Sequence, residues 1–231
     1  MRQIVLDTET TGLDPKQGHR IIEVAALELV NRRPTGKHFH EYIHPEREID
    51  SGAQEIHGIS LEFLEHKPRF AEIAPALVDF LKGAELIIHN APFDTGFLNA
   101  ELARLELGTL RDHCPSTLDT LAMARQLHPG KRNNLDALCE RYDVDNTGRT
   151  LHGALLDAEL LAEVYLAMTR GQDSFIEEAM QPHAQVRTDA DKAAIQAALR
   201  VVRANTDELA AHQLVLESIQ KTSQGKCVWL R

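Results

Sequence analysis

The chain has 231 residues, of which 43% are hydrophobic and 26% charged, so it is long enough for one well-packed domain and has the composition of a globular protein. Its formal net charge of −10 argues against a protein that holds duplex DNA on a broad basic surface, but not against a nuclease that grips a few nucleotides at a strand end. It has neither an apolar run of 18 residues nor the apolar core of a signal peptide at its N-terminus, so we predict no membrane span and no secretion.

The first part of the chain predicts strands. Arg2 to Leu6 is an apolar run that ends in acidic residues, which is typical of a buried strand. Arg20 to Val30 and Lys37 to Ile43 predict a second and a third strand. The Arg-Pro-Thr-Gly sequence of 33–36 predicts the turn between them.

Strands and helices alternate after residue 70. Pro92 fits the first turn of one helix, where the N–H that proline lacks would have no partner. The predicted elements are a helix at Phe70–Leu81, a strand at Glu85–His89, a helix from Pro92 to Leu102, a strand and a helix from Thr117, and helices at 134–142 and 154–168. We therefore predict an α/β domain over residues 1–170.

The character of the sequence changes after Arg170. Residues 171–190 are polar and lack periodicity, which predicts a flexible linker. Residues 191–231 return to helical spacing, with one helix at 191–203 and a second that Thr206 caps and that continues through Ile219. This tail is too small to bury a core of its own, so we expect it to dock on another surface.

The cysteines bear on the compartment. Cys114, Cys139 and Cys227 are odd in number and widely spaced, with no Cys-x-x-Cys pair. Such cysteines are typical of reduced thiols in the cytosol and offer no structural zinc site. We therefore predict a cytoplasmic protein.

The most informative residues are four acids and a histidine. Asp7 and Glu9 lie two apart at the end of the first strand, so both carboxylates point to the same side of the sheet. Asp94 lies in the first turn of a predicted helix. His152 and Asp157 are five apart, which is about 140° around a helix. We therefore expect His152 on the loop before the last helix, with a glycine as pivot, and Asp157 on the helix itself.

Each of these residues has an ordinary explanation by itself. Asp-x-Glu is common at strand ends, an acid in the first turn complements the helix dipole, and a loop histidine is often a surface residue. Acids that converge, however, repel one another unless a cation lies between them, and hard oxygen ligands suit Mg²⁺ or Mn²⁺. Together the five residues predict a site for two divalent cations and phosphodiester hydrolysis.

The order and spacing of these residues resemble the DEDDh family of 3′→5′ exonucleases. Its motifs Asp-x-Glu-Thr-Thr-Gly, Asn-x-x-Phe-Asp and His-x-x-x-x-Asp match residues 7–12, 90–94 and 152–157. The resemblance covers residues 1 to about 170 and implies a ribonuclease-H-like mixed β-sheet flanked by helices.

The resemblance also implies a role for each site residue. Asp7, Glu9 and Asp157 would ligate one metal ion. Asp7 would bridge to the second, and Asp94 would hold the shell of that ion, directly or through water. His152 would be the general base that takes a proton from the attacking water.

Within this family the chain is similar to the epsilon subunits of bacterial DNA polymerase III, which proofread DNA. Ile56 and His57 match a wedge segment at which an apolar residue and a histidine contact the terminal bases. Some epsilon sequences carry an acid five residues before the wedge histidine, where this chain has Gly52, so a substrate contact there is not implied. The residues that the resemblance assigns to the last nucleotide are Thr10, Leu13, Ile56, His57, Asn90 and Phe93.

The resemblance implies partners as well. The substrate would be the single-stranded 3′ end of DNA, and residues 191–231 resemble the segment that anchors epsilon to the alpha subunit of the polymerase. Residues 172–176 resemble a peptide that binds the sliding clamp, for which a plain linker is the alternative. The clamp-binding residues would be Gln172, Ser174, Phe175 and Ile176. A small theta-like accessory subunit is compatible with the sequence.

Two other functions stay open at this point. One is a stand-alone nuclease that trims RNA or short oligonucleotides, which the linker and the tail disfavour. The other is an inactive scaffold that joins clamp to polymerase, which the complete set of five site residues disfavours. Lys131, Arg132 and Arg149 either add local positive charge near His152 or are ordinary surface residues.

Overall fold

The computed structural model describes residues 1–149, 151–170, 204–223 and 229. The chain divides into two units, Met1–Glu178 and Ala179–Arg231, and each is described by itself. The predicted clamp-binding residues, the predicted helix at 191–203 and Cys227 lie outside the described residues. None of the described helices is long and apolar enough to span a membrane.

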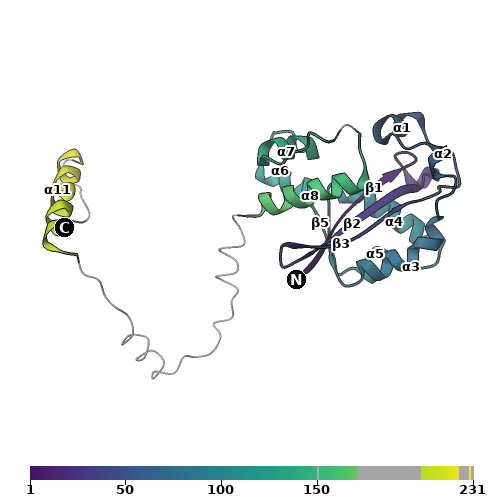
Figure 1. The fold of residues 1–231 in the computed structure, drawn as a ribbon, viewed down its shortest axis with the longest axis horizontal. Helices are drawn as coiled ribbons and strands as arrows, with labels where there is room; N and C mark the ends of the chain where they lie inside the picture. The colour runs from purple at the N-terminus through teal and green to yellow at the C-terminus, as the bar shows by residue number, and fades with distance from the viewer. Residues whose placement is uncertain (150, 171–203, 224–228, 230–231) are drawn as a thin grey trace, which may run out of the picture. The chain divides into compact units, whose positions relative to one another are not determined.

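A mixed sheet forms the centre of the first unit (Figure 1). Its order is β3-β2-β1-β4-β5. The pairs β1–β2 and β2–β3 are antiparallel, whereas β4 is parallel to both β1 and β5. The strands are β1 (Arg2–Thr10), β2 (Ile21–Val30), β3 (Arg33–Tyr42), β4 (Glu85–Ile88) and β5 (Ser116–Asp119). The predicted ribonuclease-H-like mixed sheet is confirmed.

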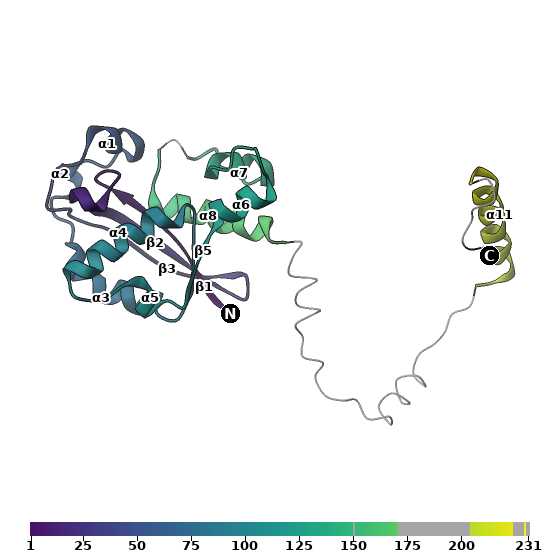
Figure 2. The same ribbon diagram turned by 180° about the vertical axis from the view of Figure 1, so that it is seen from behind.

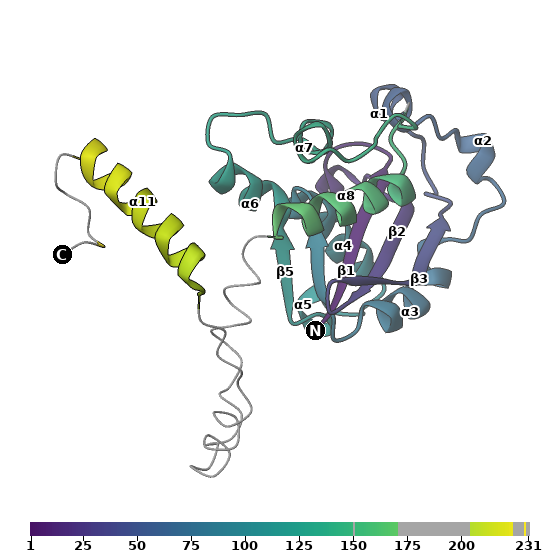
Figure 3. The same ribbon diagram turned by 60° about the vertical axis from the view of Figure 1, so that its left-hand side comes forward.

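Helices cover both faces of this sheet, with α8 in front of it in Figure 3 and α4 behind it. Figure 2 shows the other side, where α3, α4 and α5 gather. Two apolar cores result, one under α3 and α4 and the other under α7 and α8. The helices of this unit are η1 (Pro15–Gln17), α1 (Ser51–His57), α2 (Leu61–Leu64), α3 (Phe70–Leu81), α4 (Ala91–Arg104), α5 (Leu110–His113), α6 (Thr120–Leu127), α7 (Leu135–Tyr142) and α8 (Ala154–Met168).

Alternation along β1 decides where its acids point. Leu6 packs into the core with α3 and α4, whereas Val5 packs into the core with α7 and α8. Successive strand residues face opposite sides, so Asp7 and Glu9 follow Val5 toward α8. Thr8 follows Leu6 toward α4. One strand therefore delivers polar groups to both neighbouring helices.

The turn between β2 and β3 differs from the prediction. It lies at Asn31 and Arg32, which have φ angles of 50° and 63°, and not at 33–36. A two-residue hairpin turn of this kind needs positive φ at both central residues, which asparagine tolerates. Pro34 lies instead on the edge strand β3, where proline is acceptable, and Gly36 has a φ of 81° close to a register shift. The Pro-Gly signal therefore marks an irregular edge strand and not the turn.

The sequence does not predict α1 and α2, because both are short. In α1 only His57 is buried, and no side chain caps the helix, so the segment lacks an apolar period. Backbone contacts hold it instead. The Asp50 N–H donates to the Thr11 carbonyl at 3.0 Å, and the Gly58 N–H closes the last turn on Gln54 at 2.8 Å with a φ of 71°.

The described part of the second unit contains the helix α11 (Thr206–Thr222). Its cap is Asn205, which exchanges two hydrogen bonds of 2.8 and 2.9 Å with Glu208. Thr206, the predicted cap, is the first helical residue, because this capping box satisfies two N–H groups one position earlier. Several large apolar side chains of the helix are exposed, namely Leu209, Leu214, Val215 and Ile219.

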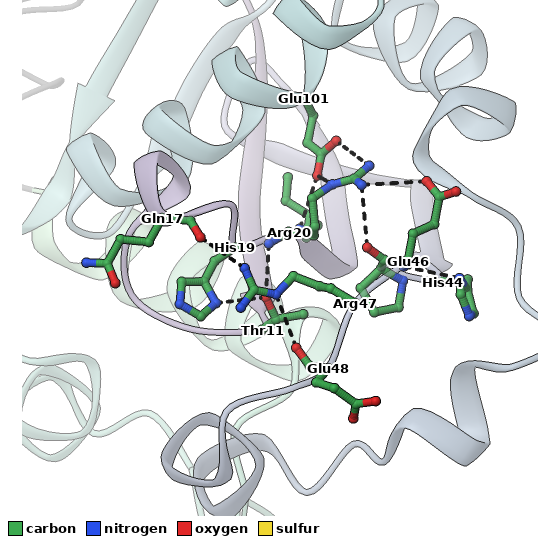
Figure 4. A network of polar contacts seen from close by, with 11 residues as sticks. Thr11, Gln17, His19, Arg20, His44, Glu46, Arg47, Glu48 and Glu101 are labelled. Atoms are coloured by element: carbon green, nitrogen blue, oxygen red, sulfur yellow. Dashed lines mark hydrogen bonds and ion pairs between the residues drawn. The ribbon is translucent and has the colours of Figure 1, made fainter.

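A buried ion pair fastens α4 to the start of β2 (Figure 4). The guanidinium of Arg20 donates from Nε and Nη2 to the two carboxylate oxygens of Glu101 at 2.6 and 2.9 Å. The side chain of Glu101 is 3% exposed, whereas Glu46, which lies 3.6 Å from the same guanidinium, is 38% exposed. The pair therefore anchors the helix that carries Asp94.

Replacing Glu101 by glutamine is expected to lower the free energy of unfolding by about 3 kcal/mol, because a largely buried guanidinium loses its charged partner. Equilibrium unfolding in urea at neutral pH measures this change. Glu46→Gln is the matched control and is expected to cost less than about 1 kcal/mol, because that pair is more exposed. Equal losses of unfolding free energy in the two variants would show that the Arg20–Glu101 pair does not anchor α4.

Candidate active site

Four carboxylates from three separate elements meet in one cavity. Asp7 and Glu9 come from β1, Asp94 from α4 and Asp157 from α8, and together with His152 they line a cavity of about 440 Å³. Asp94 and Asp157 are each the fourth residue of their helix, so the positive ends of two helix dipoles lie beside the acids. The structure thus brings together all five residues that the sequence predicts for catalysis.

Asp94 is held by the turn between β4 and α4. Asn90 turns the chain into the helix with a left-handed φ of 65°, and its N–H donates to Asp119 at 3.2 Å. Asp94 itself is buried and accepts a hydrogen bond of 2.7 Å from the Thr8 hydroxyl. Burial raises the pKa of Asp94 to about 7, and the hydrogen bond from Thr8 opposes this rise.

Arg149 lies against Asp157. Its Nε and Nη2 donate to the two carboxylate oxygens at 2.5 and 2.7 Å, and its Nη1 donates to Asp136 at 2.6 Å. Burial alone would raise the pKa of Asp157, but hydrogen bonds from Arg149 and His152 lower it below the ordinary value. Arg149 thus offsets part of the negative charge that the acids bring together.

His152 lies on the loop before α8, next to the cap residue Gly153, as the spacing predicts. Its backbone N–H donates to the Ile56 carbonyl at 3.1 Å. Its ring Nδ1 lies 3.3 Å from Asp157 and 2.9 Å from Nη2 of Arg149. The side chain is 46% exposed, so water reaches the ring.

The carboxyl groups of Asp7 and Glu9 are harder to ionise than ordinary carboxyl groups. Burial, followed by the neighbouring carboxylates, raises the pKa of Asp7 well above its ordinary value and that of Glu9 to about 8. Ligand atoms of Glu9, His152 and Asp157 all lie within 4.8 Å of one another. Carboxylate oxygens are hard donors, and a divalent cation among them would relieve the repulsion that raises these pKa values. The donor set therefore fits divalent metal ions.

Without metal, the protein is expected to lose on the order of 3 kcal/mol of stability between pH 5.5 and 8.5. An acid whose pKa is raised by folding stabilises the folded state while protonated. That contribution is lost as the pH rises from the unfolded value near 4 toward the folded values of about 7 for Asp94 and about 8 for Glu9. Urea unfolding in EDTA measures the profile, and Glu9→Gln should flatten it. A stability that rises over this range would contradict the assignment.

Glu23, which the sequence analysis does not single out, holds the start of α8. It is buried on β2 directly opposite Glu9. Its carboxylate accepts a hydrogen bond from the Ala154 N–H at 3.1 Å and contacts His40 on β3 at 2.7 Å. It thereby fixes the helix that carries Asp157. An acid inside the apolar run of the second predicted strand is the signal that could have revealed it, since such residues are seldom buried without a partner.

A second, larger pocket opens beside the carboxylates. It has a volume of about 630 Å³ and shares Glu9, Leu13 and Phe93 with the first cavity. Burial lowers the pKa of His57 in its wall, so a neutral ring faces the pocket at neutral pH. Of the residues predicted to contact substrate, this pocket contains Thr10, Leu13, Ile56, His57 and Phe93, whereas Asn90 lines the carboxylate cavity. Gly52 also lines this pocket, where it leaves open space.

Comparison with known proteins decides the family. A family model described as Exonuclease (RNase_T) matches residues 4–165. The chain is 51% identical to DNA polymerase III subunit epsilon of Escherichia coli (strain K12), over 99% of this chain and 97% of that protein. It is 50% identical to the protein of the same name from Pasteurella multocida (strain Pm70), over 99% of this chain and 93% of that protein. The chain belongs to the epsilon-subunit family of exonucleases.

Solved structures share the fold of this epsilon-family exonuclease. The zinc-bound complex of E. coli ExoI with single-stranded DNA matches with a TM-score of 0.67 at 18% identity, over 77% of this chain and 42% of that chain. The nuclease domain of 3′hExo, a DEDDh family member bound to rAMP, matches with a TM-score of 0.63 at 18% identity, over 74% of this chain and 92% of that chain. The predicted family and the predicted exonuclease activity are confirmed. The roles of individual residues stay predictions.

Proposed function

We propose that this exonuclease removes mispaired 3′-terminal nucleotides from DNA as the proofreading subunit of DNA polymerase III. The observation that carries the proposal is the junction of two cavities, one lined by Asp7, Glu9, Asp94, Asp157 and His152 and the other with apolar walls suited to a nucleobase. The similarity to epsilon subunits over nearly the whole chain supports the cellular role. The protein would act in the cytoplasm, where bacterial DNA is replicated.

We propose two divalent cations, Mg²⁺ or Mn²⁺, as cofactors. Asp7, Glu9 and Asp157 would hold one ion, and Asp7 and Asp94 would hold the second. When bound, the ions supply stabilisation of the charge that develops on the phosphoryl oxygens and on the leaving 3′ oxygen. The Thr8 hydroxyl donates a hydrogen bond of 2.7 Å to the buried carboxylate of Asp94 and would orient that carboxylate for the second ion.

His152 is proposed as the general base. Its exposed ring can take a proton from the water that attacks the terminal phosphodiester, while Arg149 and Asp157 fix the orientation of the ring. Attack in line with the leaving oxygen gives a nucleoside 5′-monophosphate and a strand that is one nucleotide shorter.

The terminal base is proposed to enter the apolar pocket between Leu13 and Ile56, whose side chains are 82% and 50% exposed. Large exposed apolar side chains next to an acidic cavity suit a planar base attached to a phosphodiester. Lys131 lines a pocket that shares Asn90 with the carboxylate cavity, and Arg132 is exposed beside it. We propose that both contact the preceding phosphates. A few such contacts suffice at a strand end, despite the net negative charge of the chain.

Preference for mispaired ends follows from a single-strand site. The terminal nucleotide must unpair before its base can enter the pocket, and a mismatched nucleotide unpairs at a lower free-energy cost. The site therefore needs no groups that recognise the mismatch itself.

The partners are proposed from the resemblance. Residues 191–231 would bind the alpha subunit of the polymerase, and the exposed apolar residues of α11, such as Leu209 and Leu214, suit such docking. Residues 172–176 would bind the sliding clamp, and a theta-like subunit would complete the assembly. Deletion of 191–231 is expected to leave nuclease activity unchanged and to abolish co-purification with the polymerase. Co-purification of the truncated protein would refute the assignment of the tail.

The function is tested with a primer–template that carries either a paired or a mispaired 3′ end. With Mg²⁺ we expect faster shortening of the mispaired end, and no shortening in EDTA. Equal rates for both ends, or faster cleavage of an RNA oligonucleotide, would favour a trimming nuclease instead. No cleavage with either Mg²⁺ or Mn²⁺ would favour a scaffold.

A further inference from the structure

The loop that carries His152 is attached to the helix that forms one wall of the base pocket. The His152 N–H donates to the Ile56 carbonyl at 3.1 Å. Ile56 is the second-last residue of α1, and the last carbonyls of a helix have no partner within it, so this bond satisfies one of them. The loop that carries His152 therefore supplies a hydrogen-bond donor to the C-terminal end of α1.

Leu151 provides a second attachment between the same two segments. A methyl group added to Gly58 would lie only 2.6 Å from Cδ1 of Leu151, so the leucine side chain rests directly on the glycine. Gly58 has a φ of 71°, which already favours glycine at this position. A backbone bond and a side-chain contact thus join consecutive residues of the loop to the end of α1.

The same short segment also lines the pocket proposed for the terminal nucleobase. Ile56 and His57 line the pocket that is proposed to receive the terminal base. A nucleobase in the pocket would contact Ile56, whose backbone carbonyl accepts the hydrogen bond from the His152 amide. Ile56 and this hydrogen bond therefore connect the bound nucleotide with the proposed general base, His152.

The start of α1 is fixed elsewhere. The Asp50 N–H donates to the carbonyl of Thr11, which follows β1. Since His57 is the buried side chain of α1, little apolar packing holds the helix, and a ligand at its end can shift its position at low cost.

We propose that the contact of Leu151 with Gly58 and the hydrogen bond from His152 to Ile56 couple the base pocket to the general base, so that a terminal base in the pocket places His152 for proton transfer. Leu151 is then a positioning residue. The inference rests on the proposed function and adds a requirement to it: rapid hydrolysis needs a base on the last nucleotide, beyond the phosphodiester itself.

A two-by-two comparison of enzyme and substrate tests the coupling. The enzymes are wild type and Leu151→Ala, and the substrates are an oligonucleotide with a normal 3′ nucleotide and one that ends in a deoxyribose without a base. Leu151→Ala is expected to lower kcat on the normal substrate by about 10- to 100-fold with little change in KM, since a small misplacement of a catalytic group has effects of this size. On the baseless substrate the two enzymes are expected to have the same kcat. Leu127→Ala, a substitution of another partly exposed leucine away from both cavities, is the control and should change neither rate.

The pattern of losses decides the outcome. Equal losses on both substrates would show that Leu151 only stabilises the loop and would overturn the proposal, as would no loss on either. Gly58→Ala, whose new methyl group pushes against Leu151, should also lower kcat on the normal substrate only. The double variant with Leu151→Ala should lose less kcat than the product of the two single fold-losses.

A second measurement does not depend on hydrolysis, so failure of the coupling can be told apart from failure of the proposed function. Hydrogen exchange at the His152 amide is followed in wild type with thymidine 5′-monophosphate or with 2-deoxyribose 5-phosphate. The nucleotide, but not the sugar phosphate, is expected to slow the exchange, and Leu151→Ala should remove the difference. Equal exchange with the two probes in wild type would overturn the coupling. Absence of nuclease activity in wild type would instead overturn the proposed function.

Discussion

Replacing Asp7 by alanine is expected to abolish hydrolysis while leaving the fold intact. Asp7 is the carboxylate proposed to bridge both metal ions, so its removal should lower kcat by at least about a thousandfold, equivalent to roughly 4 kcal/mol. The fold should survive, because burial and neighbouring acids raise the pKa of Asp7. Removing a carboxylate from such a site relieves repulsion, so metal-free stability at pH 8 should stay the same or rise.

Rapid-mixing assays with enzyme in excess, together with urea unfolding in EDTA, measure both parts of this prediction. Mg²⁺ should stabilise wild type and should no longer stabilise Asp7→Ala. The control is Asp79→Ala, which removes an exposed acid of α3 and should leave activity and the Mg²⁺ effect unchanged. Activity close to wild type in Asp7→Ala would rule out the two-metal assignment.

Replacing His152 by alanine is expected to lower kcat by about 10²- to 10⁴-fold at neutral pH, which is the usual loss when a general base is removed. Metal binding should persist, because the carboxylates remain. The residual rate should increase with pH, since hydroxide then replaces the proton transfer that the ring no longer provides. The pH profile of the cleavage rate, with Mg²⁺ affinity from calorimetry, separates these effects.

His66→Ala is the matched control for this variant, because His66 is exposed and lies outside both cavities. It should leave the rate and the pH profile unchanged. If His152→Ala lowered Mg²⁺ affinity as strongly as it lowered kcat, His152 would be a metal ligand and not the base. The two variants also differ from each other: Asp7→Ala should lose stabilisation by Mg²⁺, whereas His152→Ala should keep it.

Local pattern predicted the main elements of the nuclease unit well where one face of an element is buried. The helix α8 begins and ends at the residues that its apolar pattern predicts, and β2 differs by one residue at its start. The sequence pattern does not predict the hairpin turn at Asn31, because Pro34 and Gly36 give a stronger turn signal although both lie on the edge strand β3. Short helices such as α1 depend on backbone contacts with distant segments, which no local pattern contains.

For the site, motif spacing located the five residues but not what surrounds them. The hydrogen bond of Thr8 to Asp94 follows from strand alternation, yet it needs the position of α4 to be recognised. The sequence does not distinguish Arg149 from Lys131 and Arg132 as a source of positive charge near His152. The fold shows that the guanidinium of Arg149 donates hydrogen bonds to Asp157. Such contacts also depend on the packing of separate elements, which the local sequence pattern does not determine.

The wide separation of the site residues along the chain has a consequence for biosynthesis. Asp7 lies on the first strand of the nuclease unit and Asp157 on α8, the last helix among its described residues. β1 must pair with β4 and receive α8 before the two acids meet. Contacts between such distant segments form late in folding, and a ribosome releases the last helix only after the rest of the unit has been synthesised. A nascent or partly unfolded chain therefore lacks the complete set of acids that we propose to bind metal, and we expect such a chain to have no nuclease activity.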